Sequence, residues 1–168
     1  LVGSHFFIND AENMILFAVQ TEEDNLDIYQ SAVDPVDNSW STPHPILGDV
    51  NSEYNDDNPY LSHDGKFLYF SSDRPESIGG YDVFKVAIDE STGLWGKPIN
   101  MGFPINTIDD EVNFQLNEDN ISGFLSSDRL HGQGGYDIYY FHEQGKVLAS
   151  GSVYNNETKE LLKGARVD

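Results

Sequence analysis

The chain contains 168 residues, 38% of them hydrophobic and 12% aromatic, and carries a formal net charge of −20 at pH 7. This length and apolar content are typical of a folded domain with a sizeable core, not of a disordered chain. The acidic excess repels nucleic-acid phosphates and anionic lipid surfaces, so neither is an expected partner. Its simplest interpretation is a solvated acidic surface. The absence of cysteine excludes disulfides and thiol chemistry.

The first predicted unit covers residues 5–57. Its innermost strand is expected at residues 5–8, followed by strands at 14–19 and 27–33 and an edge strand at 40–47. Two prolines interrupt the last of these. Because proline has no N–H group to donate, they place that strand at the outer edge of its sheet.

A second unit covers residues 58–112 and repeats this order. An Asp-Gly pair at residues 64–65 predicts a tight turn between two of its strands. Its four strands are expected at residues 59–61, 66–71, 81–88 and 95–101. A third unit starts at residue 113, ends near 143, and has expected strands at residues 113–116, 122–126 and 136–142.

These units recur with a fixed period. Asp27, Asp82 and Asp137 are 55 residues apart, as are Trp40 and Trp95. About four strands per period, with no helical spacing between them, predict the blades of a β-propeller. The central apolar runs do not alternate with polar residues, so both faces of these strands should be covered by neighbouring blades. The predicted fold class is therefore all-β, with about three four-stranded antiparallel blades in an incomplete ring.

Residues 144–168 differ in character. Strands are expected at residues 145–154 and 161–168, joined by a polar turn. We interpret this segment as the first hairpin of a separate β-sandwich domain. A propeller typically needs four to eight blades to close, so three repeats predict a part of a longer chain, or ends covered by something else.

The repeats resemble the TolB-like, WD-repeat-like β-propeller repeat of bacterial envelope proteins. The resemblance covers roughly residues 5–143, and the motifs that carry it stand at residues 58–59, 62–66, 68–74, 79–82, 124–129 and 134–139. Residues 151–167 resemble the first hairpin of a carboxypeptidase-regulatory-like domain. The first repeat departs from the pattern, because Gln20-Thr21 stands where Asp-Arg is expected.

A propeller followed by such a domain resembles a group of Bacteroidota envelope proteins that end in an OmpA-like domain and are associated with type IX secretion and gliding. The resemblance implies a non-enzymatic scaffold in the periplasm, tethered to the outer membrane. Its implied partners are other cell-envelope proteins, and peptidoglycan through a domain outside this chain. No apolar run reaches the roughly 18–20 residues that cross a bilayer, so direct membrane insertion is not expected.

Six charged residues flank the loops at residues 73–81 and 128–136 and are the candidate binding residues: Asp73, Arg74, Asp82, Asp128, Arg129 and Asp137. Arginine could bind a carboxylate or phosphate, and the aspartates a sugar or Ca²⁺. Their repetition in two blades favours a local role instead, with Asp accepting backbone N–H bonds of the turn. The acidic clusters at residues 56–57 and 109–111 do not fit the EF-hand pattern. No metal or cofactor is expected.

Two alternatives to a scaffold remain. A propeller glycoside hydrolase or glycan-binding protein would need carboxylates flanking one glycosidic bond, and the sequence cannot pair its many acidic residues. The chain could also be the regulatory propeller of a peptidase. No Gly-x-Ser-x-Gly elbow is present, so the α/β-hydrolase type of serine centre is absent from this sequence. We assign no catalytic residue, and the resemblance implies a chain without enzymatic activity.

Overall fold

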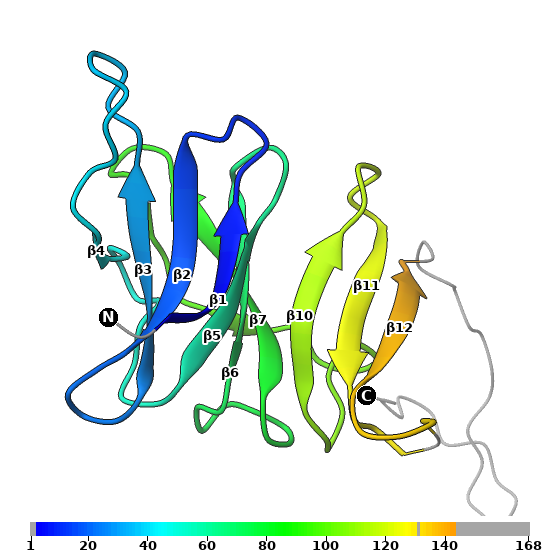
Figure 1. Ribbon diagram of the computed structural model, residues 1–168. Coiled ribbons are helices and arrows are strands. Elements are labelled where there is room, and N and C mark those ends of the chain that lie inside the picture. The colour runs from blue at the N-terminus through cyan, green and yellow to red at the C-terminus, as the bar shows by residue number, and fades with distance from the viewer. Residues whose placement is uncertain (1–2, 131, 144–168) are drawn as a thin grey trace, which may run out of the picture.

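The computed structural model describes residues 3–130 and 132–143, which form three antiparallel sheets and no helix (Figure 1). Each sheet is one blade of an incomplete β-propeller, as predicted. Blade 1 contains β1 (Gly3–Ile8), β2 (Met14–Gln20), β3 (Leu26–Ala32) and β4 (His44–Pro45). Blade 2 contains β5 (Asp56–Leu61), β6 (Phe67–Ser72), β7 (Asp82–Asp89), β8 (Leu94–Trp95) and β9 (Ile99–Asn100). Blade 3 contains β10 (Glu111–Leu116), β11 (Ser122–Ser127) and β12 (Asp137–His142).

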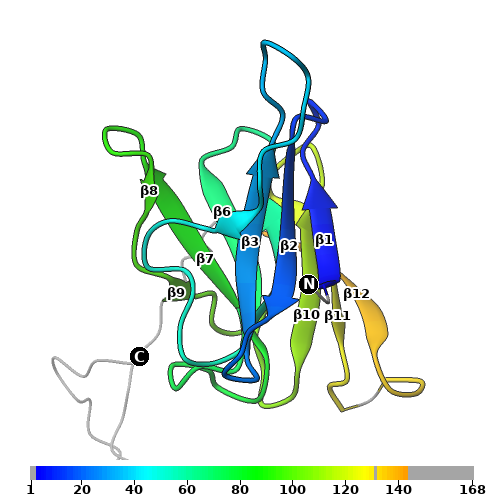
Figure 2. The same cartoon turned by 60° about the vertical axis from the view of Figure 1, so that its left-hand side comes forward.

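The outer strands are shorter than expected. The segment predicted at residues 40–47 forms only the two-residue β4 and an isolated bridge between Val33 and Trp40. The segment predicted at residues 95–101 is split into β8 and β9, with Pro98 between them. Prolines cannot donate to the ladder, so only short pieces of these segments pair with the sheet. β8 and β9 lie at the outer edge of blade 2, away from β1 and β10 (Figure 2).

Two apolar layers join the blades. Leu16 and Ile28 of blade 1 pack with Phe70 and Phe84 of blade 2 in the first layer. The second layer joins blades 2 and 3 and contains the buried side chains of Tyr60, Tyr69, Val83, Phe114 and Leu125. The side chains of β6 alternate between the two layers and are almost all buried. This confirms for blade 2 that both faces of the apolar run are covered.

The predicted hairpin at residues 144–168 lies outside the described residues. Within the part of the chain that the structure describes, no helix is long and apolar enough to span a bilayer.

The predicted Asp-Gly turn is present between β5 and β6, where Gly65 adopts a φ of 71° and its N–H donates to Ser62 O over 2.8 Å. Asp64 supports the turn by accepting hydrogen bonds from Ser62 Oγ at 2.6 Å and Lys66 N at 3.1 Å.

His63 and Asp10 connect this turn to the β1–β2 turn of blade 1, with His63 Nδ1 2.8 Å from Asp10 Oδ2. The hydrogen bond to the Asp10 side chain raises the pKa of His63 above its ordinary value. The contact therefore stabilises the fold fully below the unfolded-state pKa of His63, and this stabilisation is lost as pH rises through the raised folded-state pKa. We expect Asp10→Asn to lower the pKa of His63 in an NMR titration. An unchanged pKa would contradict the contact.

Candidate functional site

The inner strands β1, β5 and β10 share an irregularity that shapes the candidate site. β5 lies beside both β1 and β10, and each of the three strands is first in its sheet. The pairing register shifts between Gly3 and Phe6, between Asp57 and Tyr60, and between Val112 and Gln115, with one extra residue on the inner strand each time. A bulge of this kind bends the strand and redirects its side chains.

Asparagine supports two of these bulges. Asn58 adopts a φ of 53° and Asn113 a φ of 54°. Asparagine tolerates this left-handed conformation better than most residues other than glycine, because its short side chain bonds locally. His5 is the residue of β1 that is equivalent to Asn58. Each of the two lies within the register shift of its own strand, before the residues that pair regularly again.

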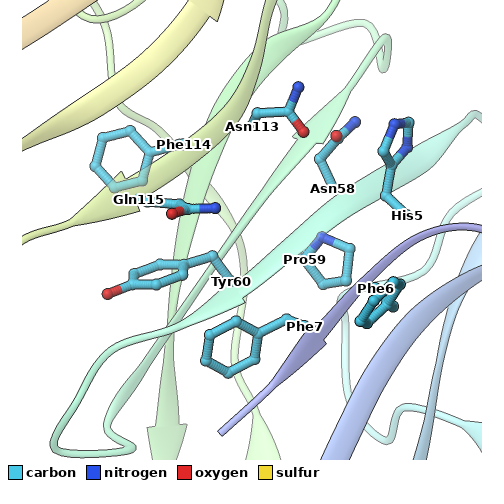
Figure 3. A pocket seen from close by; sticks show the side chains of 9 residues that line it. All are labelled: His5, Phe6, Phe7, Asn58, Pro59, Tyr60, Asn113, Phe114 and Gln115. Atoms are coloured by element: carbon cyan, nitrogen blue, oxygen red, sulfur yellow. The ribbon is translucent and has the colours of Figure 1, made fainter. Parts of the chain in front are cut away.

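A pocket of about 190 Å³ lies on the three bulged strands (Figure 3). Each inner strand contributes three residues at equivalent positions, and together they mix amide, imidazole and aromatic groups. The lining residues are His5, Phe6, Phe7, Asn58, Pro59, Tyr60, Asn113, Phe114 and Gln115. We call this the axial pocket, because in a propeller the innermost strands surround the central channel.

Asn58 is the most informative residue of the axial pocket. Asn58 is only 7% exposed, yet its Oδ1 atom has no hydrogen-bond partner. Among the described residues, the only other such buried side-chain atom is Ser71 Oγ. A buried carbonyl oxygen without a donor is costly and calls for an explanation, such as a bound ligand. In Figure 3 the amide groups of Asn58 and Asn113 face the same gap between β5 and β10.

A second pocket of about 320 Å³, which we call the outer axial pocket, shares His5, Asn58 and Asn113 with the first. It is also lined by two tyrosines that follow the Gly-Gly pairs of their blades, Tyr81 and Tyr136. The remaining lining residues are Asp57, Val112 and Ser126.

The outer axial pocket is surrounded by negatively charged carboxylates. Burial, followed by the carboxylates of Asp73, Asp57, Asp110 and Asp56, raises the pKa of Tyr81 to about 12. Burial and a hydrogen bond to Asp110 likewise raise the pKa of Tyr136 to about 12. Both phenols therefore remain neutral near pH 7. Tyr136 Oη donates to Asp110 Oδ2 at 2.9 Å.

Asp57 is the carboxylate that lines the outer axial pocket, and it is 5% exposed. Its Oδ2 lies 2.9 Å from His5 Nδ1, a contact that joins β1 to β5. Its Oδ1 accepts a hydrogen bond of 2.7 Å from Asn58 N, which helps to hold the bulge.

The two candidate arginines line neither axial pocket. Both belong to the frame, by which we mean the contacts that hold each blade to the connection leading into it. Arg74 is buried and pairs with the carboxylate of Asp56, and its Nη2 also donates to Val50 O at 2.7 Å. Its guanidinium lies 5.0 Å from the ring centres of Phe70 and Phe84.

Arg129 repeats this arrangement one blade later. Its Nη2 donates to Glu111 Oε1 at 3.1 Å and to Ile105 O at 2.8 Å. The same four groups, arginine, carboxylate, backbone carbonyl and supporting serine, recur at the 55-residue spacing. Ser72 and Ser127 each accept a hydrogen bond from the arginine Nε.

The four predicted aspartates are also engaged within turns and connections. Asp73 accepts bonds of 2.8 Å from both the backbone N and the Nδ2 of Asn55, and Asp128 accepts one of 2.9 Å from Asp110 N. Asp82 accepts from Ile78 N at 2.7 Å and from Asn100 Nδ2 at 2.6 Å. Asp137 accepts from Gln133 N at 2.6 Å. The structure thus does not bring the six candidates together in one cavity. Within the described ranges, no group of three or more His, Cys, Asp or Glu side chains could hold a metal ion.

Sequence reasoning missed the axial pocket. A signal for it was present, because Asn58 and Asn113 are separated by the same 55-residue period as the aspartates. A recurring asparagine is compatible with a left-handed backbone position, and the inner strands of a propeller surround its central channel.

A comparison with protein-family models found no match, and no curated protein matches the sequence. Among solved structures, a puromycin-hydrolysing peptidase of Mycobacterium tuberculosis is similar, with a TM-score of 0.53 and 13% sequence identity over 96% of this chain and 22% of that one. TolB from Acinetobacter baumannii gives a TM-score of 0.48 and 19% identity over 82% of this chain and 30% of that one. Our chain thus corresponds to less than a third of either protein. The likeness shows the fold alone.

Proposed function

We propose that this chain is a non-catalytic protein-binding and scaffolding module of a cell-envelope protein. The observation that carries the proposal is the axial pocket, which is built from equivalent residues of three blades and contains a buried acceptor without a donor. Equivalent positions on rigid strands form a recognition surface whose geometry is set by the frame.

The chemistry of the pocket supports recognition over hydrolysis. Glycoside hydrolysis uses two carboxylates on either side of the scissile bond. The axial pocket is lined by no Asp or Glu of the described chain, and the outer axial pocket by Asp57 alone. The buried carboxylates of Asp56 and Glu111 are paired with arginines of the frame.

We place the module in the periplasm, in a protein associated with the outer membrane and linked to peptidoglycan and type IX secretion through parts outside this chain. The support for this placement is the resemblance of the repeats at residues 58–82 and 124–139 to envelope propeller repeats. Reading the full-length gene for a lipoprotein signal and a peptidoglycan-binding domain would test it directly.

A capture experiment with two tryptophan variants tests the binding proposal. Gln115 is exposed in the axial pocket, and Gln115→Trp would fill it. Gln133 is exposed in the loop that follows Arg129, so Gln133→Trp alters a predicted binding loop with an equally large side chain. We expect the native chain and Gln133→Trp to recover the same outer-membrane or secretion components from cross-linked envelope extracts, and Gln115→Trp to recover at least about tenfold less.

Three results would contradict the proposal. Equal recovery by all three proteins would show that the axial pocket is not the binding surface, and loss with Gln133→Trp alone would assign binding to the loop. Turnover of envelope glycans that disappears on a single carboxylate-to-amide substitution would contradict the non-catalytic part and favour a glycan-active enzyme.

A further inference from the structure

The unpartnered Asn58 Oδ1 defines what the axial pocket lacks. An amide oxygen accepts hydrogen bonds, so the missing group is a donor. The carbonyl is held in place by the bulge, since Asn58 N is bonded to Asp57 Oδ1 at 2.7 Å and the residue is more than nine-tenths buried. A ligand that brings an N–H group within hydrogen-bond distance of this oxygen would supply the missing donor.

The second observation concerns charge. Asp57 lines the outer axial pocket beside Asn58, and Asp110 reaches its rim through the 2.9 Å bond from Tyr136 Oη. The raised pKa of Tyr81, caused first by burial and then by four surrounding carboxylates, shows the same negative field. No Lys or Arg lines either axial pocket within the described chain. An anionic ligand would be repelled here, and a cationic one attracted.

The third observation distinguishes between cations. Two aromatic rings, Tyr81 and Tyr136, line the outer axial pocket next to the acceptors. A guanidinium group is planar, carries five N–H donors and stacks on aromatic faces, whereas an ammonium group is a compact and strongly hydrated charge. Rings, an amide oxygen and a carboxylate in one cavity suit the guanidinium best.

We propose that the two axial pockets together bind an arginine side chain presented by the protein partner, with Asn58 Oδ1 and the Asp57 carboxylate as acceptors. This inference rests on the proposed function and specifies the partner: a segment with an exposed arginine. The strongly acidic chain, with its net charge of −20, would also accelerate the encounter with a basic partner at low salt.

The test compares two tripeptides that differ in one charge. Acetyl-Ala-Arg-Ala-amide is the probe, and the same peptide with citrulline keeps the shape but loses the positive charge. We expect the arginine peptide to shift the NMR signals of the Asn58 and Asn113 side-chain amides, and to bind at least about tenfold more tightly than the citrulline peptide, a ratio equal to about 1.4 kcal/mol. Binding should weaken as the salt concentration increases.

A pair of matched variants assigns the effect to Asn58. Asn58→Gly removes the amide and tolerates the φ of 53°, and Asn38→Gly makes the same change at an exposed turn with a φ of 59°. We expect only Asn58→Gly to weaken binding of the arginine peptide, by about tenfold. Equal binding of the two peptides, signal shifts confined to residues outside the axial pockets, or equal effects of the two variants would overturn the inference.

The outcome is separable from that of the capture experiment. Envelope components that are captured by the native chain and lost with Gln115→Trp, together with no binding of the arginine peptide, would overturn the arginine assignment and leave the proposed function standing. Binding of the arginine peptide without any envelope partner would support the assignment and contradict the proposed function.

Discussion

Replacing Arg74 with methionine is expected to lower the free energy of unfolding by about 3–5 kcal/mol, because it leaves the buried Asp56 carboxylate without its countercharge. The Asp56 side chain is fully buried, and that of Arg74 is 9% exposed. The substitution also removes the bond to Val50 O, which ties the connection between blades 1 and 2 to blade 2. Urea denaturation monitored by tyrosine and tryptophan fluorescence would measure the loss.

Lys66→Met provides the matched control. Lys66 Nζ lies 3.3 Å from Glu90 Oε1, but the two side chains are 57% and 73% exposed. Exposed pairs of this kind contribute at most about 1 kcal/mol. Arg129→Met should fall between the two, because the Arg129 side chain is 20% exposed beside a fully buried Glu111. Equal losses for Arg74→Met and Lys66→Met would show that the buried pair does not stabilise the frame.

The repeat pattern was sufficient to predict the blades. Strands buried on both faces need apolar residues along their whole length, so they leave unbroken apolar runs that recur every 55 residues. It was insufficient for the connections between blades. The acidic clusters at residues 56–57 and 109–111 lie where one unit leads into the next, yet Asp56 and Glu111 are fully buried and begin the inner strands. Their charge is compensated by an arginine 18 residues later in the chain, a distance at which composition gives no pairing information.

In each connection between blades, one asparagine side chain forms hydrogen bonds with a strand of the preceding blade. Asn51 accepts a bond of 2.8 Å from Ile28 N and donates one of 3.0 Å to Ile28 O. Asn106 makes the equivalent bonds of 2.8 and 2.9 Å with Val83. One side-chain amide thus bonds both the N–H and the C=O of a strand residue, beside the backbone bonds that Ile46 N and Met101 N make to the same two carbonyls. This arrangement could not be derived from the sequence, because an asparagine in a polar segment is equally typical of a turn.

Blade 1 lacks the buried arginine–carboxylate pair of the later blades, so it shows which features of a blade do not need that pair. Gln20 and Thr21 stand where the later blades have Asp and Arg, and Gly3 occupies the place of the paired acid in the register of β1. Blade 1 nevertheless forms a regular sheet with a buried face that packs on blade 2. The buried arginine–carboxylate pair is therefore not needed for a sheet to form, and in blades 2 and 3 its arginine bonds the connection that leads into the blade.

Replacing Phe114 with alanine should loosen blade 3 while leaving blade 1 intact. The Phe114 ring is 2% exposed and stacks between Tyr69 of β6 at 4.8 Å and Phe141 of β12 at 5.0 Å. Removing a buried phenylalanine side chain typically costs about 3–5 kcal/mol. Among the described residues the two layers share no buried side chain, although the partly buried Phe7 contacts both. The loss should therefore be concentrated in the layer between blades 2 and 3.

Hydrogen–deuterium exchange can resolve that distribution, since amides of a locally destabilised unit exchange through its own opening. We expect faster exchange in β10, β11 and β12 of Phe114→Ala, with the amides of β2 and β3 unchanged. Phe6→Ala is the control, because Phe6 is 69% exposed on β1 and its removal should cost less than about 1 kcal/mol. Uniformly faster exchange across all three blades would contradict two separate layers and would show that the blades unfold as a single cooperative unit.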